Sequence, residues 1–140
     1  STLKANSKAA SIDVAKLLCP FDGPNTKEIQ QNHNLAHGFD LTNLYEVTKP
    51  YITEGRRYTG SFNVNNEQRD VGVITGSEIS KQYGEAGLPE NTFNVYTNGH
   101  AGQSLAAYAP IGLMIHHTGD ANDYVGKGLS GGTVIVKAPF

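Results

Sequence analysis

The sequence predicts a mainly-β fold, a short right-handed parallel β-helix over residues 61–140, preceded by a helix-rich segment over residues 1–60. Three observations support this prediction. A repeat of about twenty residues runs through the second half of the chain. Glycine becomes dense there and the helical period disappears. In the first half, apolar residues recur at helical spacing between polar turns. We therefore expect two domains, divided near residue 60.

Helix signals are concentrated in the first half. Apolar residues of Ser7–Leu18 lie roughly at helical spacing, and Pro20 stops the run. Asn25 and Glu28 form a variant of the capping box, which favours a helix that continues to about His37. The same signals predict two more helices, one from Asp40 to Pro50 and a short one that begins near Thr75 and Glu78 and ends before Gly84 and Pro89.

The repeat appears when Phe93–Gly112 is aligned with Leu113–Gly132 at a spacing of twenty. A third copy begins at Thr133, and a fainter one begins at Phe62, because SFNV resembles TFNV. The matched positions are Gly99 with Gly119, Ala101 with Ala121, Gly112 with Gly132, Phe93 with Leu113, Val95 with Ile115, and Ile115 with Ile135.

A period of twenty is too short for solenoids of helix pairs and suits one turn of a β-solenoid. We expect Phe93–Tyr96, Leu113–His116 and Thr133–Lys137 to pair in parallel as a stack. Strand residues alternate between two faces, so Phe93, Val95, Leu113, Ile115 and Ile135 are expected to point inward. Glycines suit corners, where the backbone needs positive φ or close approach. The predicted corner residues are Gly99, Gly102, Gly112, Gly119, Gly126, Gly128, Gly131 and Gly132.

Charge and composition narrow the function classes. Lys and Arg total 11 and Asp and Glu total 13, for a net charge of −2. Nucleic-acid and membrane-surface binders need a basic excess, so neither partner is expected. The longest apolar run, 105–115, contains Pro110 and Gly112 and is too short to span a bilayer. The single Cys19 cannot form an internal disulfide, which fits a reducing compartment. We expect a cytoplasmic protein.

Two motifs resemble ligand sites without meeting their requirements. Gly126–Gly131 spells G-x-G-x-x-G, but a dinucleotide fingerprint needs a strand before it and a helix opening within it. Here a polar DAND stretch precedes the motif and the strand-like TVIV follows. Asp120, Asn122 and Asp123 resemble a calcium loop, yet position twelve is Gly131 where an EF-hand needs Glu. Turn capping is the better interpretation of these side chains.

The remaining candidates are histidines and a thiol. His33 and His37 could share a helix face, but two ligands are too few for structural zinc. His116 and His117 should alternate in a strand, one packed or hydrogen-bonded inside and the other solvated. Cys19 has no base placed near it by a motif, so a buried inert thiol is expected. We therefore predict no catalytic, cofactor-binding or metal-binding residue in this chain.

Three segments carry a family resemblance: GEAGLPENTF, GHAGQSLAAYAPIG and GDANDYVGKGLSGGTVIVKAP. They resemble the C-terminal glycine-repeat (GXGXG) β-helix domain of the glutamate synthase large subunit. The likeness begins near HNLAHGFD and covers roughly the last hundred residues. His100, Ala106 and Ala107 depart from the family pattern, because small residues or glycine are usual at those positions. The family's solenoid also continues beyond the position of Phe140.

The resemblance implies a parent enzyme that makes two glutamates from glutamine and 2-oxoglutarate. In that family an amidotransferase domain with an N-terminal cysteine releases ammonia, and a barrel domain holds FMN and an iron–sulfur cluster. The glycine-repeat domain is the scaffold between them, and no active-site residue maps onto this chain. The cofactors and the partner domains are therefore expected elsewhere in the parent.

Two functions stay open: a non-catalytic structural domain or fragment of glutamate synthase, and a stand-alone β-helix assembly or binding module. A solenoid cut after Lys137 leaves an open apolar end without a capping unit. We therefore expect the isolated chain to form a homo-oligomer.

Overall fold

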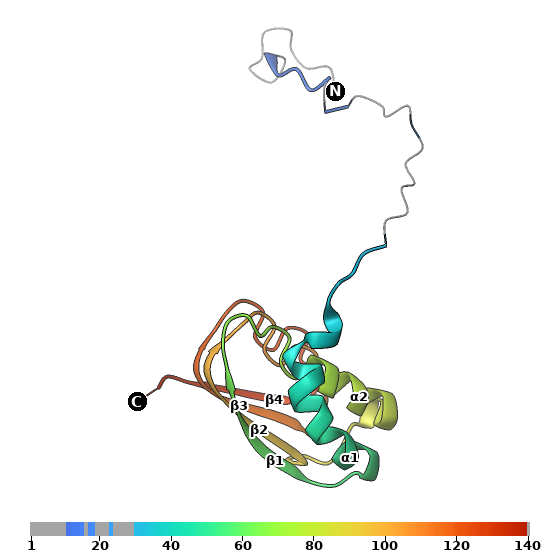
Figure 1. Ribbon diagram of the computed structural model, residues 1–140, viewed down its shortest axis with the longest axis vertical. Coiled ribbons are helices and arrows are strands. Elements are labelled where there is room, and N and C mark those ends of the chain that lie inside the picture. The colour runs from blue at the N-terminus through green and yellow to red at the C-terminus, as the bar shows by residue number, and fades with distance from the viewer. Residues whose placement is uncertain (1–10, 16, 19–22, 24–29, 140) are drawn as a thin grey trace. The chain divides into compact units, whose positions relative to one another are not determined.

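The computed structural model (Figure 1) describes residues 11–15, 17, 18, 23 and 30–139. The chain divides into one unit of residues 1–33 and a compact unit of residues 34–140. Residues 7–10 and 16 of the predicted helix 7–18, and residues 25–29 of the predicted helix 25–37, lie outside the described residues. Residues 12–15, 17, 18 and 30–34 are not helical, so both predictions are wrong there. In the described part of these segments there is a turn at Val14, whose carbonyl accepts from Leu17 and Leu18, and a short 3-10 helix, η2, at Leu35–His37.

The compact unit is built on one sheet of four parallel strands, ordered β1-β2-β3-β4. In Figure 1 the helices α1 and α2 lie together beside this sheet. The elements follow in the order η3 (a π-helix, Asp40–Tyr45), α1 (Glu46–Glu54), β1 (Tyr58–Val64), α2 (Val73–Tyr83), η4 (a 3-10 helix, Gly84–Ala86), β2 (Phe93–Ala101), β3 (Leu113–Ala121) and β4 (Thr133–Lys137).

The predicted fold class, a mainly-β right-handed parallel β-helix, is wrong. The structure is a small α/β domain with a single parallel sheet and two α-helices. The reason lies in the core. The inward side chains of β2 and β3 pack in one hydrophobic cluster with side chains of the helical layer, and not with further strands of a closed coil. The cluster joins Phe93, Val95, Leu113 and Ile115 to Leu44, Ile52 and Ile79, all of them almost fully buried.

The parallel stacking of the repeats is confirmed. β2 and β3 pair in the predicted register of twenty, so that Phe93 lies beside Leu113 and Val95 beside Ile115. β4 also pairs in parallel with β3, but in a register of nineteen. Ile115 therefore lies beside Val134. The prediction that Ile135 points inward is wrong, because a shift of one residue places a side chain on the other face of a strand.

The faint first copy is real as a strand but was aligned incorrectly. Residues 58–64 form β1, which pairs in parallel with β2. Its Tyr58, and not Phe62, lies beside Phe93, while Phe62 lies beside Thr97. The likeness of SFNV to TFNV thus misplaced the register by four residues. Shared residue types identified the strand, whereas the pairing with β2 determines which side chains meet the core.

The third predicted helix is correct in place but extends past its predicted end. Pro50 lies inside α1, which continues to Glu54. Proline lacks the backbone donor and crowds the carbonyl four residues earlier, which is unfavourable inside a helix, yet α1 continues past Pro50. Gly55 ends the helix, because its φ of 63° turns the chain and its N–H donates to Ile52 O. Likewise α2 ends at Tyr83, just before Gly84, as predicted.

A distant carboxylate caps α2. Asp40, only 2% exposed, lies at the start of η3. Its Oδ2 accepts from the backbone N–H of Ile74 at 2.6 Å and of Thr75 at 3.3 Å, and its Oδ1 accepts from the Thr75 hydroxyl at 2.8 Å. Unpaired N–H groups at a helix N-terminus attract such a group. Asp40 therefore fixes the first helical segment to the start of α2.

A column of close backbone contacts runs across the strands at Val64, Gly99 and Gly119, which the sheet register places side by side. A Cβ atom on Gly119 would overlap the Gly99 carbonyl oxygen, and one on Gly99 would overlap the Val64 carbonyl oxygen. Gly119 also has a φ of 137°, which L-residues rarely adopt. Both features require glycine at positions 99 and 119 of this column.

We predict that Asp40 makes stability depend on pH in an unusual direction. Burial raises the pKa of the Asp40 carboxyl above 3.8, against the lowering effect of its hydrogen bonds to Thr75, Ile74 and Gly72. The folded state then holds the proton more tightly than the unfolded state. The stabilisation that this protonation gives is complete at pH values below the pKa of the carboxyl in the unfolded chain. It is lost as pH rises through the raised pKa of the carboxyl in the folded chain.

The test measures urea unfolding of the parent chain and of Asp40→Asn, which does not titrate, between pH 3.5 and 7. The free energy of unfolding of the parent should fall relative to that of Asp40→Asn as pH rises. A relative rise with pH would contradict the prediction. Asp40→Ala, which leaves the α2 donors without their partner, should cost about 2–4 kcal/mol at any of these pH values.

We also predict a large difference between two glycine substitutions. Gly119→Ala combines an unfavourable φ with overlap on a carbonyl oxygen, and should cost at least about 3 kcal/mol. Gly126→Ala is the matched control. Its φ is 61°, and the nearest atom to a new Cβ is Val134 Cγ2 at 3.8 Å. It should cost only about 1–2 kcal/mol. Thermal melts that rank the two variants equally, or in the reverse order, would refute the role of the column.

Candidate functional site: the stacked glycine loops

Three loop segments stack on one another beyond the ends of β1, β2 and β3. They are residues 65–72, 102–112 and 122–132, and backbone hydrogen bonds join them. The first and second are linked by Gly102 N–H to Gln68 O at 3.1 Å and Ala106 N–H to Val71 O at 2.8 Å. The second and third are linked by Gly126 N–H to Leu105 O at 2.9 Å and Tyr108 N–H to Lys127 O at 2.8 Å. The repeated loops thus continue the stacking of the strands.

Positive φ recurs at every second residue in these loops. In the second loop the values are 65° at Ser104, 57° at Ala106 and 57° at Tyr108. In the third loop Tyr124, Gly126 and Gly128, at 68°, 61° and 62°, occupy the equivalent positions twenty residues later. The conformation therefore belongs to the repeat and not to the glycines alone. Ala106, a departure from the expected glycine pattern, keeps the glycine-like backbone.

The eight predicted corner glycines lie in three kinds of place. Gly99 and Gly119 are inside β2 and β3 and have positive φ. Gly112, Gly126, Gly128 and Gly131, also with positive φ, lie in the loops or just before a strand. Gly102 and Gly132 lack positive φ, but a Cβ there would lie 2.7 Å from Gln68 O and 2.8 Å from Ala109 O respectively. Their effect on stability stays a prediction.

His117 is a buried polar group that the repeat places against the preceding strand. It is 1% exposed, and its Nδ1 lies 2.9 Å from Oγ1 of Thr97, its partner in the sheet register. Its Nε2 lies 2.8 Å from the carbonyl oxygen of Asp120. A carbonyl oxygen only accepts, so in the neutral ring Nε2 carries the proton and Nδ1 accepts from the Thr97 hydroxyl. Both ring nitrogens are thus used within the fold.

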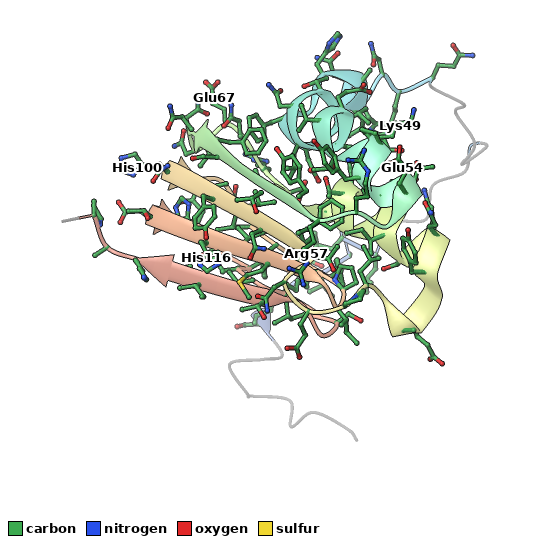
Figure 2. All side chains as sticks on the ribbon, turned by 90° about the horizontal axis from the view of Figure 1, so that it is seen from below. Lys49, Glu54, Arg57, Glu67, His100 and His116 are labelled. Carbon is green, nitrogen blue, oxygen red and sulfur yellow. The ribbon has the colours of Figure 1, made fainter. Side chains whose placement is uncertain are left out.

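His116 lies on the opposite face of β3, as the predicted alternation of the two histidines requires, and this is confirmed. It stacks on Tyr96 with ring centroids 4.8 Å apart and an interplanar angle of 13°. His100 forms an exposed pair with Asp120, with Nδ1 3.1 Å from Oδ2. Figure 2 shows His100 at the end of β2 and His116 on the sheet. These contacts place one polar pair and one aromatic pair on the surface.

The ligand motifs considered in the sequence do not meet their structural requirements. The Gly126–Gly131 motif is followed by β4, so no helix opens within it. The backbone of Asn122 and Asp123 bonds to the preceding layer, through Asn122 N–H to Ala101 O and Ser104 N–H to Asp123 O. Both residues therefore belong to the turn between layers. Cys19 lies outside the described residues.

In the part of the chain that the structure describes, the hollows are small and the side chains that could bind a metal are scattered. A hollow of about 250 Å³ lies beside Leu35, Asp40 and Val73, smaller than the usual small-molecule site. Among residues 30–139 and the few earlier ones described, no three His, Cys, Asp or Glu side chains gather as a metal site would need. Nor does this part of the chain form a helix long and apolar enough to cross a bilayer.

Sequence reasoning missed the non-glycine residues with positive φ. The signal was present in the alignment at twenty, which places Ala106 on Gly126 and Tyr108 on Gly128. A glycine in one copy indicates the backbone conformation of its partner in the other copy. The Asp40 cap was also missed, because Asp40 and Thr75 are 35 residues apart in sequence. No local pattern connects them.

Comparison with known proteins agrees with the glycine-rich geometry. The family model of the GXGXG motif matches residues 40–140. The chain is 44% identical over 135 residues to the glutamate synthase [NADPH] large chain of Bacillus subtilis, covering 96% of this chain. It is 37% identical over 139 residues to the glutamate synthase [NADH] of Saccharomyces cerevisiae, again covering 96% of this chain. A ferredoxin-dependent glutamate synthase 2 of Synechocystis is 33% identical over 125 residues, or 84% of this chain.

The matched region is a small part of each relative. It spans 9% of the Bacillus protein, 6% of the yeast protein and 8% of the Synechocystis protein. The family resemblance predicted from the sequence is confirmed by the family model together with these relatives. The chain therefore belongs to the family of the GXGXG domain, the C-terminal domain of the glutamate synthase large chain.

Proposed function

We propose that this chain is a non-catalytic structural domain of a glutamate synthase, whose parent enzyme makes glutamate from glutamine and 2-oxoglutarate. The observation that carries the proposal is the use of its buried ionisable groups. Asp40 and His117 are both buried, and the polar side-chain atoms of each form hydrogen bonds within the fold. A catalytic acid or base needs a polar atom that can reach a substrate.

The named electron donors of the relatives support the same proposal. Proteins named for NADPH, NADH and ferredoxin all match this domain. A domain common to all three is a poor candidate for the site that selects the donor. The proposal accordingly assigns the FMN, the iron–sulfur cluster and the choice of donor to other domains of the parent enzyme, in the cytoplasm.

The proposal also includes contact with other parts of the enzyme. Among the strands that the structure describes, β4 ends the strand order and so has a hydrogen-bonded neighbour on one side only. Edge strands of this kind pair readily with another chain segment. The third loop adds exposed apolar side chains near this edge, at Tyr124 and Leu129. In the parent these groups contact neighbouring parts of the enzyme, whereas in the isolated chain they favour self-association into a homo-oligomer.

The test compares substitutions in the full-length enzyme. His100→Ala and Asp120→Ala remove the exposed pair that most resembles a catalytic dyad, and His117→Gln disturbs the buried hydrogen bonds. We expect the first two variants to keep kcat/KM for glutamate formation near the parent value. His117→Gln should lower stability by about 1–3 kcal/mol, yet keep its specific activity while folded.

The contrary outcome is equally clear. General acid–base groups contribute about 100-fold or more to rate. A loss of kcat of that size in a variant with parental melting temperature and parental flavin content would show that the domain takes part in the chemistry. Asn66→Ala, an exposed change just beyond β1, is the matched control for disturbance at the same end of the sheet.

A further inference from the structure

The face of the sheet turned away from the core has an unusual composition. Strand alternation and register place fourteen residues on it: twelve in three rows that cross the four strands, and the exposed pair His100 and Asp120 at the end of β2 and β3. Two of the fourteen, Lys137 and Asp120, are charged residue types, whereas about a quarter to a third of an ordinary protein surface is charged. The rows are Thr59, Asn94, Met114 and Thr133; Ser61, Tyr96, His116 and Ile135; and Asn63, Asn98, Thr118 and Lys137.

The centre of this outer face is apolar and aromatic. Tyr96 is 43% exposed and stacks on the half-buried His116. Ile135 lies beside His116 in the sheet register, and the half-buried Met114 is two residues before it on the same strand. Asparagine, serine and threonine surround these four, together with Lys137, two residues after Ile135 on β4. An uncharged centre rich in aromatic residues and methionine, with a polar rim, is the composition of a protein–protein interface.

The helical side of the domain is different. Its exposed side chains include Glu46, Lys49, Glu54 and Lys81, which suits contact with water. Figure 2 shows Lys49 and Glu54 on the helical layer and His116 on the strands. The charged helical side and the largely uncharged sheet face belong to one small domain, so the contrast distinguishes two faces of the same fold. It indicates that the helical layer faces solvent and that the outer sheet face meets a partner.

We propose that the outer sheet face docks against another domain of the same polypeptide. The proposal rests on the proposed function, since it requires the parent enzyme. Fourteen residues are fewer than the 20–30 that a stable interface between separate molecules uses on each side, which argues against a second copy as the occupant. A domain of the same polypeptide needs a smaller interface, because covalent linkage provides an effective concentration near the millimolar range. The matched relatives supply such a domain, since more than nine-tenths of their length lies outside this region.

The chemistry of the occupant follows from the face. It presents an uncharged surface with apolar side chains to meet Tyr96, Met114 and Ile135, and hydrogen-bonding groups to meet the amide and hydroxyl rim. A basic or acidic partner would find no opposite charge at the centre. A membrane surface is also a poor fit, because the face lacks the cluster of cationic residues that anionic lipid headgroups attract. A neutral protein surface fits the face on both counts.

The experiment places the photo-cross-linking residue p-benzoylphenylalanine at position 96, and separately at position 114, of the full-length enzyme. The control is the same residue at Glu54, which is exposed on α1. We expect positions 96 and 114 to form cross-links to peptides outside residues 34–140 in the same chain, at the mass of a single chain on a denaturing gel. The cross-linker at position 54 should not form this cross-link. Mass spectrometry of the digest identifies the partner peptide.

Two results would overturn the proposal. Cross-links at twice the chain mass would mean that a second copy covers the face, and no cross-link beyond the position 54 control would mean that solvent does. Neither result depends on whether the domain is catalytic, which the kinetics of His100→Ala and Asp120→Ala measure. The docking face can therefore fail while the non-catalytic role stands, and the reverse is equally detectable.

Discussion

The close approach of one backbone layer to the next is the constraint on which the rest of this domain depends. At Val64, Gly99 and Gly119 the layers come so near that a methyl group on either glycine would overlap a carbonyl oxygen of the preceding strand. Beyond the strands, the loops maintain the same stacking through hydrogen bonds such as Gly126 N–H to Leu105 O. The strands and loops therefore share one repeat, and its spacing is set by the backbone.

A stack of backbone layers cannot bury its own apolar side chains, and this explains the helices. Phe93 and Ile115 project from one face of the sheet and need a cover. η3, α1 and α2 supply it with Leu44, Ile52 and Ile79. Asp40 then joins η3 to the start of α2, so the cover is held together by a polar bond as well as by packing. The helical layer thus does in this domain what further strands would do in a closed coil.

The sequence allowed the repeat to be predicted, but not how its face is covered. The alignment at twenty correctly paired Phe93 with Leu113, because both the glycine and the apolar positions repeat. It failed at Ile135, where β4 is shifted by one residue and the inward position belongs to Val134. The run TVIVK has polar residues at positions 133 and 137, on the face that also carries Ile135, so its period of two indicates the buried face where the spacing of twenty does not. The helix from Asp40 was predicted from local signals, whereas its docking through Thr75 depends on contacts distant in sequence.

The backbone stacking also determines which side chains are used in internal contacts and which are left on the surface. Backbone bonds hold the loops together, so residues with positive φ range from glycine to Ser104, Ala106 and Tyr108. The inward face is committed to the core, and His117 is committed to Thr97 and to the turn after β3. The outer face retains the side chains that no internal contact explains, such as the stacked Tyr96 and His116. A domain whose order comes from its backbone, and which has an aromatic and apolar group at the centre of its outer sheet face, fits the structural role proposed above.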